Sequence, residues 1–218
     1  MTGLSRILRG ALVATITAGV TGGITGCAGL QTLQSVTEPT DLYDLTPKSS
    51  YDESLPAITA QLVIEEPTAA SSVNTDHIAI KPNSYQVQYF PDARWVDRAP
   101  LLVQTLLVES FENTGKVAAV GRRAIGLTSD FTLITELREF QAMVSDDENG
   151  SIFVDVQLNM KIIQEPYGLI VASKSFEQRQ LAASSEMLSV VEAFDVALGK
   201  TMGRSVDWAV RRISEIAR

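Results

Sequence analysis

The clearest hydrophobic pattern of the chain lies between positions 152 and 162, where apolar residues alternate with mainly polar ones. The apolar positions are Ile152, Val154, Val156, Leu158, Met160 and Ile162. Because successive side chains of a strand point to opposite faces of a sheet, this alternation predicts a strand with one buried face. The dipeptide Asn149-Gly150 just before it favours a tight hairpin turn. We therefore expect an antiparallel meander in which residues 131–144 and 169–181 pair with this strand.

Shorter strand patterns occur in the first half of the chain. Residues 58–65 alternate between apolar and polar types and end before Pro67, which cannot donate to a sheet ladder. Further short extended segments are expected at positions 42–45, 77–80, 85–89 and 116–121. These segments would supply additional strands to the same sheet as the meander.

The segment 99–114 has the apolar spacing of an amphipathic helix. Pro100 stands in its first turn, where proline is tolerated because the first N–H groups of a helix lack an intrahelical partner. Gly115 follows directly after the segment and indicates its end. We therefore expect one helix between the shorter strands and the meander.

A second, longer helix is expected at the C-terminus, with a broad apolar face. We place its start at Ser189, because Ser189 and Glu192 have the spacing of a capping box. Gly199 and Gly203 lie within this helix, and we interpret them as positions of close packing on the sheet. The alternative is that these glycines only weaken the helix.

Together the elements predict an α+β fold, with a mostly antiparallel sheet, helices packed on one face and a long C-terminal helix. We divide the chain into a signal segment at 1–26, a tether at 27–56 and a single domain at 57–218. The tether is expected because residues up to Pro56 are mostly polar, contain several prolines and lack sustained periodicity.

The N-terminus has the three-part layout of a secretory signal. A short basic stretch at 1–9 precedes a small apolar stretch at 10–20, and residues 21–26 are rich in Gly and Thr. The apolar stretch is shorter than the roughly 20 residues that a membrane-spanning helix requires. We therefore expect residues 1–26 to be removed.

The segment Ile24-Thr25-Gly26-Cys27 resembles the lipobox of bacterial lipoproteins, in which the cysteine thiol takes the diacylglycerol. Cys27 is the only cysteine of the chain, so no disulfide can form within it. We predict lipidation of Cys27, the alternative being an incidental cysteine after an ordinary signal peptide. Ala28 stands where an aspartate would favour retention in the inner membrane, so we expect the outer membrane, with the domain in the periplasm.

The composition of 45% hydrophobic and 20% charged residues is that of an ordinary folded domain. The formal net charge is −8, and residues 1–26 contribute two arginines and no acid, so the mature chain is more acidic still. Nucleic-acid binding draws its affinity from clustered Lys and Arg, and we therefore exclude nucleic acid as a partner.

Few residues offer catalytic chemistry. The single histidine, His77, restricts any triad or multi-histidine metal site to that residue. The acidic pairs at 65–66 and 146–148 fall at a strand end and a hairpin tip, where we expect solvated charge, although a hydrolase using two carboxylates stays open as an alternative. No glycine-rich phosphate loop is present in the sequence. We expect no enzymatic activity, no cofactor and no metal.

Trp95 stands before the first predicted helix and admits two interpretations. It is either an exposed aromatic side chain that binds a partner or a core residue that closes the domain where the helix begins. We favour the core position, with Arg94 and Asp97 oriented around it. These three residues are the candidates for partner contact or a structural role.

Several segments resemble the auxiliary lipoproteins of ABC-type and MCE-type transport systems, the PqiC/YmbA-like proteins. The resemblance is carried by Leu42-Tyr43-Asp44-Leu45, by residues 78–97 with Tyr89-Phe90 and Ala93-Arg94-Trp95, by Asp130-Phe131-Thr132-Leu133 with Phe140, and by residues 190–198 with Trp208. These segments span nearly the whole mature chain, and their order agrees with the lipobox.

The resemblance implies a non-enzymatic periplasmic component on the outer membrane. Its partners would be an MCE-type protein and ABC transporter subunits, and it would help phospholipids or other hydrophobic molecules to cross between the membranes. Ring-like homo-oligomers occur in the family. His77 stands where relatives are expected to carry a more basic residue, which puts any contact through that charge in doubt. A structural lipoprotein of another envelope-assembly machinery is the alternative.

Overall fold

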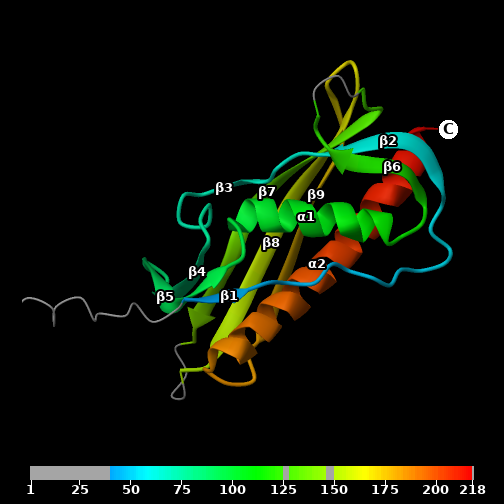
Figure 1. The fold of residues 1–218 in the computed structure, drawn as a ribbon. Coiled ribbons are helices and arrows are strands. Elements are labelled where there is room, and N and C mark those ends of the chain that lie inside the picture. The colour runs from blue at the N-terminus through cyan, green and yellow to red at the C-terminus, as the bar shows by residue number, and fades with distance from the viewer. Residues whose placement is uncertain (1–39, 125–127, 146–149, 218) are drawn as a thin grey trace, which may run out of the picture. The chain divides into compact units, whose positions relative to one another are not determined.

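The computed structural model describes residues 40–124, 128–145 and 150–217, all within one compact unit of the chain (Figure 1). These residues form a nine-stranded sheet and two helices, α1 (Ala99–Glu112) and α2 (Met187–Ile216). Both helices lie on the same face of the sheet, so the predicted α+β class is confirmed. Neither described helix has the length and apolarity needed to cross a membrane.

Three long strands form the predicted antiparallel meander. They are β7 (Phe131–Val144), β8 (Ile152–Gln164) and β9 (Leu169–Leu181), and β8 pairs with both of the others. The ladder between β7 and β8 shifts by one residue at Arg138, which lies between Leu137 and Glu139. This bulge lets Leu137 and Phe140 both point into the core although their spacing is three.

The other edge of β7 is covered in succession by three short strands that run parallel to it. These strands are β2 (Ile58–Ile64), β3 (Thr68–Ala69) and β4 (His77–Asn83). The remaining strands extend the sheet outward: β6 (Val117–Arg122) pairs with β2 in parallel, β5 (Gln86–Trp95) pairs with β4 in the antiparallel direction, and β1 (Asp41–Tyr43) pairs with β5 in parallel. The sheet is therefore mixed, although its longest ladders are antiparallel.

The core lies between the two helices and one face of the sheet. Five of the six apolar positions of β8 predicted to be buried are confirmed, since Val154, Val156, Leu158, Met160 and Ile162 are at most 1% exposed, whereas Ile152 at the start of the strand is half-buried. Trp95, Phe140 and Phe194 form an aromatic cluster in which the ring centroids are 5.0 to 5.6 Å apart. This cluster joins β5, β7 and α2, so it connects the short strands to the meander.

The segment between β1 and β2, which we expected to belong to a tether, lies along both helices. Leu45 and Leu55 from this segment are buried in the core. The backbone N–H of Lys48 donates to the Ser110 hydroxyl of α1 at 3.0 Å, and the Lys48 carbonyl accepts from Asn113 at 3.1 Å. These contacts hold the segment across α1 on its way to the sheet.

The start of α2 differs from the prediction. The helix begins at Met187 with Glu186 as its N-cap residue, so the capping box placed at Ser189 is wrong. Ser184 explains the earlier start, because its hydroxyl accepts from the backbone N–H of Glu186 at 3.2 Å and donates to the Ser189 hydroxyl at 3.0 Å. The Ser184 side chain thus forms a local turn with the backbone two residues further on, and the helix begins directly after this turn, before the predicted cap.

The two glycines of α2 do not pack closely on the sheet. A Cβ at Gly199 would meet nothing within 4 Å, and one at Gly203 would lie 3.5 Å from the Cε atom of Lys48. The close-packing interpretation is therefore wrong, because a Cβ at Gly199 would have no neighbour and the atoms nearest to one at Gly203 belong to Lys48 and not to the sheet. Gly203 instead leaves room for the Lys48 side chain of the segment that crosses the helices.

Candidate functional site

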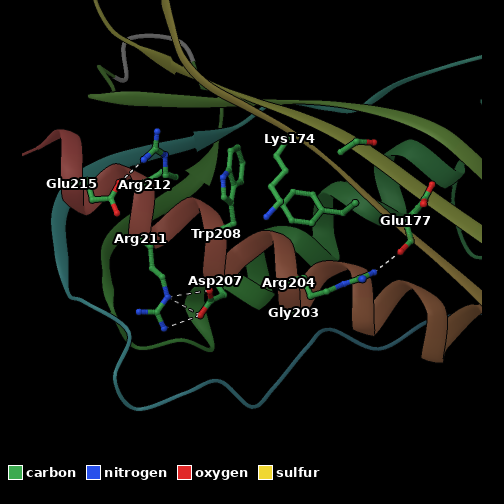
Figure 2. Close-up of a pocket in the computed structure, with 11 residues that line it drawn as sticks. Lys174, Glu177, Gly203, Arg204, Asp207, Trp208, Arg211, Arg212 and Glu215 are labelled. Atoms are coloured by element: carbon green, nitrogen blue, oxygen red, sulfur yellow. Dashed lines mark hydrogen bonds and ion pairs between the residues drawn. The ribbon is translucent and has the colours of Figure 1, made fainter.

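One long edge of the sheet is open. Within the described part of the chain, β9 pairs with β8 only, so its outer edge of 13 residues has no neighbouring strand. Helix α2 runs beside this edge, and a groove of about 700 Å³ lies between them (Figure 2). Residues 174–177 of β9 and one face of α2 between Gly203 and Glu215 line the groove.

Two aromatic rings form the floor of the groove. Phe176 of β9 and Trp208 of α2 pack edge to face, with ring centroids 5.5 Å apart. Phe176 is buried, whereas Trp208 is half-buried and lines the groove. The ammonium of Lys174 lies 5.2 Å from the centroid of the Phe176 ring. The floor therefore combines apolar surface with a cation placed over an aromatic face.

Two basic side chains of α2 donate hydrogen bonds to β9 between Glu177 and Gln180. Lys200 donates to the side-chain amide oxygen of Gln180 at 3.0 Å. Arg204, one helical turn further on, donates to the backbone carbonyl of Glu177, as Figure 2 shows. Because residues four apart share one face of a helix, Lys200, Arg204 and Trp208 form a row along the strand.

Three cations have no carboxylate partner among the described residues: Lys174 at the floor of the groove, and Lys200 and Arg204 in the row on α2. Near the end of α2 the charges are paired: Arg211 contacts Asp207 at 3.1 Å, and Arg212 contacts Glu215 at 2.6 Å. Hydrogen bonding to Asp207 raises the pKa of Arg211 above its usual value. The free positive charge of the groove therefore lies beside β9.

The opposite face of the meander shows a different pattern. Here Lys81 pairs with Glu139 at 3.3 Å, and Arg179 binds Asp155 through two hydrogen bonds of 2.7 Å. The Asp155 carboxylate raises the pKa of Arg179 above its usual value through these hydrogen bonds. Since these cations already have partners, they offer less to an incoming carboxylate than those beside β9.

The predicted candidate residues lie away from the groove, near the start of α1. Trp95 is 1% exposed and belongs to the core cluster, as the favoured interpretation held. Arg94 forms an ion pair of 3.0 Å with Asp76, and Asp97 accepts the backbone N–H of Arg98 at 2.7 Å. Cys27 lies outside the described residues, so its predicted lipidation stays a prediction.

The other sequence candidates are engaged in local contacts. His77 packs against Tyr89 with ring centroids 5.3 Å apart. Glu65 accepts from Arg123 at 2.7 Å and Glu66 from Arg98 at 2.8 Å, so each carboxylate of this pair has its own cation. The acidic residues 146–148 lie outside the described ranges. Among the described residues, no three His, Cys, Asp or Glu side chains gather into a metal site.

The groove was not predicted from the sequence, although a signal for it exists. Lys200, Arg204 and Arg212 recur at helical spacing in the C-terminal helix, with Trp208 in the same row. That spacing indicates a basic row on one side of the helix. It does not reveal that the row faces the open edge of a strand, because the position of β9 depends on the tertiary fold.

A mixed sheet with two helices on one face and a groove beside its open edge makes this a small α+β domain. The family model of the ABC-type transport auxiliary lipoprotein component matches residues 43–203. The chain therefore belongs to this family, which confirms the resemblance found in the sequence. Membership makes the chain a lipoprotein component of the cell envelope.

Individual proteins are similar to the chain in sequence or in fold. An uncharacterized protein of Bradyrhizobium diazoefficiens is 29% identical over 168 residues, which cover 77% of this chain and 44% of the relative. The chain thus spans less than half the length of that relative. A crystal structure of a Xanthomonas campestris protein matches with a TM-score of 0.76 and 24% identity, covering 81% of this chain and 98% of the other. A second, uncharacterized crystal structure has a TM-score of 0.57 and 13% identity, covering 81% and 99%.

Proposed function

We propose that the protein is an auxiliary subunit of an ABC/MCE-type transport system that moves phospholipids or other hydrophobic molecules between the two membranes. It is held at the periplasmic face of the outer membrane by lipid on Cys27. It acts without catalysis, by binding the MCE-type protein or the ABC subunits and holding them at the membrane.

The observation that carries this proposal is the open groove beside β9 in a member of a transport-auxiliary family. The groove lies at a strand edge and holds a half-buried tryptophan and two cations, Lys174 and Arg204, that have no carboxylate partner among the described residues. Such a surface suits another protein chain. Residues at its far end, Arg211 and Arg212, hold their own carboxylates and so stabilise the helix that forms one wall.

Affinity purification from detergent-solubilised membranes tests the proposal. The tagged full-length protein should enrich an ABC ATPase, a permease and an MCE-type protein relative to an untagged strain. Enrichment of a different envelope-assembly machinery, with none of these subunits, would contradict the proposal and favour the structural alternative. Separation of inner and outer membranes on a density gradient tests the predicted location in the same strain.

A further inference from the structure

The geometry points to β9 as the docking edge for an extended, carboxylate-bearing segment of another subunit of the transport system, which would pair with β9 as an additional strand. This inference rests on the proposed function, since it names the surface through which that function is carried out. Over five consecutive positions, the segment would carry an acidic residue at the first and the fifth and an apolar residue at the third, with any residue between them.

The first argument is the open strand edge. A strand that pairs on one side only leaves a row of backbone N–H and C=O groups available on its other side. In β9 one of these groups, the Glu177 carbonyl, already accepts a hydrogen bond from Arg204. This contact shows that the Glu177 carbonyl points away from β8. It also shows that a charged side chain now covers an edge to which a further strand could be added.

The second argument is the register of side chains along the edge. Lys174, Phe176 and Gln178 occupy alternate positions of β9 and pair with Met160, Leu158 and Val156 on the buried face of β8. They therefore all face α2. Arg204 touches the side chain of Gln178 at 3.5 Å, and Trp208 packs on Phe176. Along the edge, the side of β9 that faces α2 therefore presents a cation at Lys174, aromatic rings at Phe176 and Trp208, and a second cation at Arg204.

The third argument is charge. Lys174 and Arg204 lack carboxylate partners among the described residues, in a chain with a net charge of −8. A strand paired opposite β9 would place alternate side chains against these environments, at a spacing of about 6.6 Å for every second residue. Carboxylates would meet Lys174 and Arg204, and an apolar side chain would cover Trp208. The pattern is the same in both chain directions, so it holds for parallel and antiparallel pairing.

Binding would require Arg204 to change partners. Its guanidinium would leave the Glu177 carbonyl and bind the incoming carboxylate, while the partner's backbone N–H would take over the carbonyl. Each polar group would then keep a hydrogen bond, and the new ion pair would be partly shielded from water. A segment without carboxylates would leave Arg204 and Lys174 unpaired, so the same side chains would select against other strands.

Photo-crosslinking in membranes tests the inference with the lipidated full-length protein. A photo-reactive phenylalanine derivative replaces Glu177 on the edge, and in the control it replaces Gln157, which pairs with Glu177 on the interior strand β8. We expect a crosslink from the edge position at least about tenfold stronger than from the control. Mass spectrometry should map it to a segment of an ABC or MCE subunit with the acid, apolar, acid pattern.

Charge reversal supplies the second measurement. The double variant Lys174→Glu and Arg204→Glu should lower the crosslink by at least about tenfold, because attraction becomes repulsion. Lys161→Glu, on the opposite face of β8, is the matched control and should leave the crosslink unchanged. Circular dichroism and the midpoint of thermal unfolding confirm that each variant is folded.

Four outcomes would overturn the inference: no crosslink from the edge, a crosslink to a second copy or another part of this chain, a crosslinked segment without the pattern, or equal loss in the Lys161→Glu control. Purification of the ABC subunits from the same membranes keeps the two proposals separate. If those subunits copurify but do not crosslink at β9, the inference fails while the proposed function stands. If they do not copurify, the proposed function itself fails.

Discussion

The carboxylate of Asp195 on α2 accepts two hydrogen bonds from Thr46, one from its backbone N–H at 2.7 Å and one from its hydroxyl at 2.9 Å. The two residues are 149 positions apart in the chain. Thr46 lies just after β1, so this contact holds the first described segment on the last helix. The segment between β1 and β2 is thereby joined to the helix that forms one wall of the groove.

Removal of this contact should loosen the first segment. We expect Asp195→Ala to lower the free energy of unfolding by about 1–2 kcal/mol, because two hydrogen bonds to a carboxylate are lost at a partly exposed site. Urea unfolding followed by circular dichroism measures the change. Glu192→Ala, at an exposed position of the same helix, is the control and should have little effect. Equal losses in both variants would show that the contact with Thr46 does not stabilise the fold.

The two tryptophans should differ in their contribution to stability. Trp95→Ala removes a 1%-exposed ring that contacts Phe140 and Phe194, and the cavity left behind should cost about 3–5 kcal/mol. Trp208→Ala removes a half-buried ring at the groove floor and should cost clearly less. Urea unfolding of both variants tests the difference. A loss for Trp208→Ala as large as that for Trp95→Ala would contradict the assignment of Trp95 to the core and Trp208 to the groove.

Tyr51 should make stability fall at alkaline pH. Its hydroxyl is buried beside Ser110 without a hydrogen bond of normal geometry among the described residues, and burial raises the pKa of Tyr51 well above its usual value. The Ser110 hydroxyl opposes this effect only in part. The folded state therefore holds the tyrosine proton more tightly than the unfolded chain, so stability is lost as the pH rises above about 10.

Tyr51→Phe tests this dependence, since phenylalanine has no proton to lose. The variant should show a smaller decrease in the thermal midpoint between about pH 9 and 11 than the parent protein. Tyr85→Phe, at a fully exposed tyrosine, is the control and should follow the parent. An unchanged pH dependence in Tyr51→Phe would show that its hydroxyl is not buried as described.

Arg94 should control the titration of Asp76. The hydrogen bond from Arg94 lowers the pKa of Asp76 below its usual value, aided by the charge of the guanidinium. A carboxylate with a lowered pKa stabilises the fold above the pKa of the unfolded chain, about 3.9, and this contribution is lost as the pH falls through the folded pKa. We expect Arg94→Ala to raise the pKa of Asp76 towards its usual value. A carbon-13 NMR titration of the carboxyl groups measures the pKa of Asp76. Arg138→Ala, which removes the partner of Glu136, is the control and should leave the pKa of Asp76 unchanged.

Cys27→Ser tests the predicted anchor. The variant should fold normally but leave the membrane fraction, because the two or three acyl chains of a bacterial lipoprotein supply most of the membrane affinity. Fractionation with a lipoprotein control, together with mass spectrometry of the N-terminal peptide, measures the change. A Cys27→Ser protein that stays with the membranes would show that another contact holds it there. Loss of transport-linked phenotypes is expected in the same strain.

The sequence alone determined the class of fold and the long elements. The alternation in β8 and the hairpin signal before it identified the meander, since period-two patterning reports directly which side chains face the core. The two helices were also predicted from the spacing of their apolar residues, because that spacing likewise reports which side chains face the core. Local signals were less dependable at the start of α2, where Ser184 rather than Ser189 shapes the turn into the helix.

Only the tertiary structure decided how these elements meet. The parallel pairing of β2, β3 and β4 with β7 leaves no trace in alternation, because alternation reports which face of a strand is buried and not the direction of its neighbour. The groove likewise depends on α2 lying beside β9. The sequence shows the basic row of Lys200 and Arg204 and the two aromatic residues. The long-range packing of a helix against a strand edge turns them into one surface.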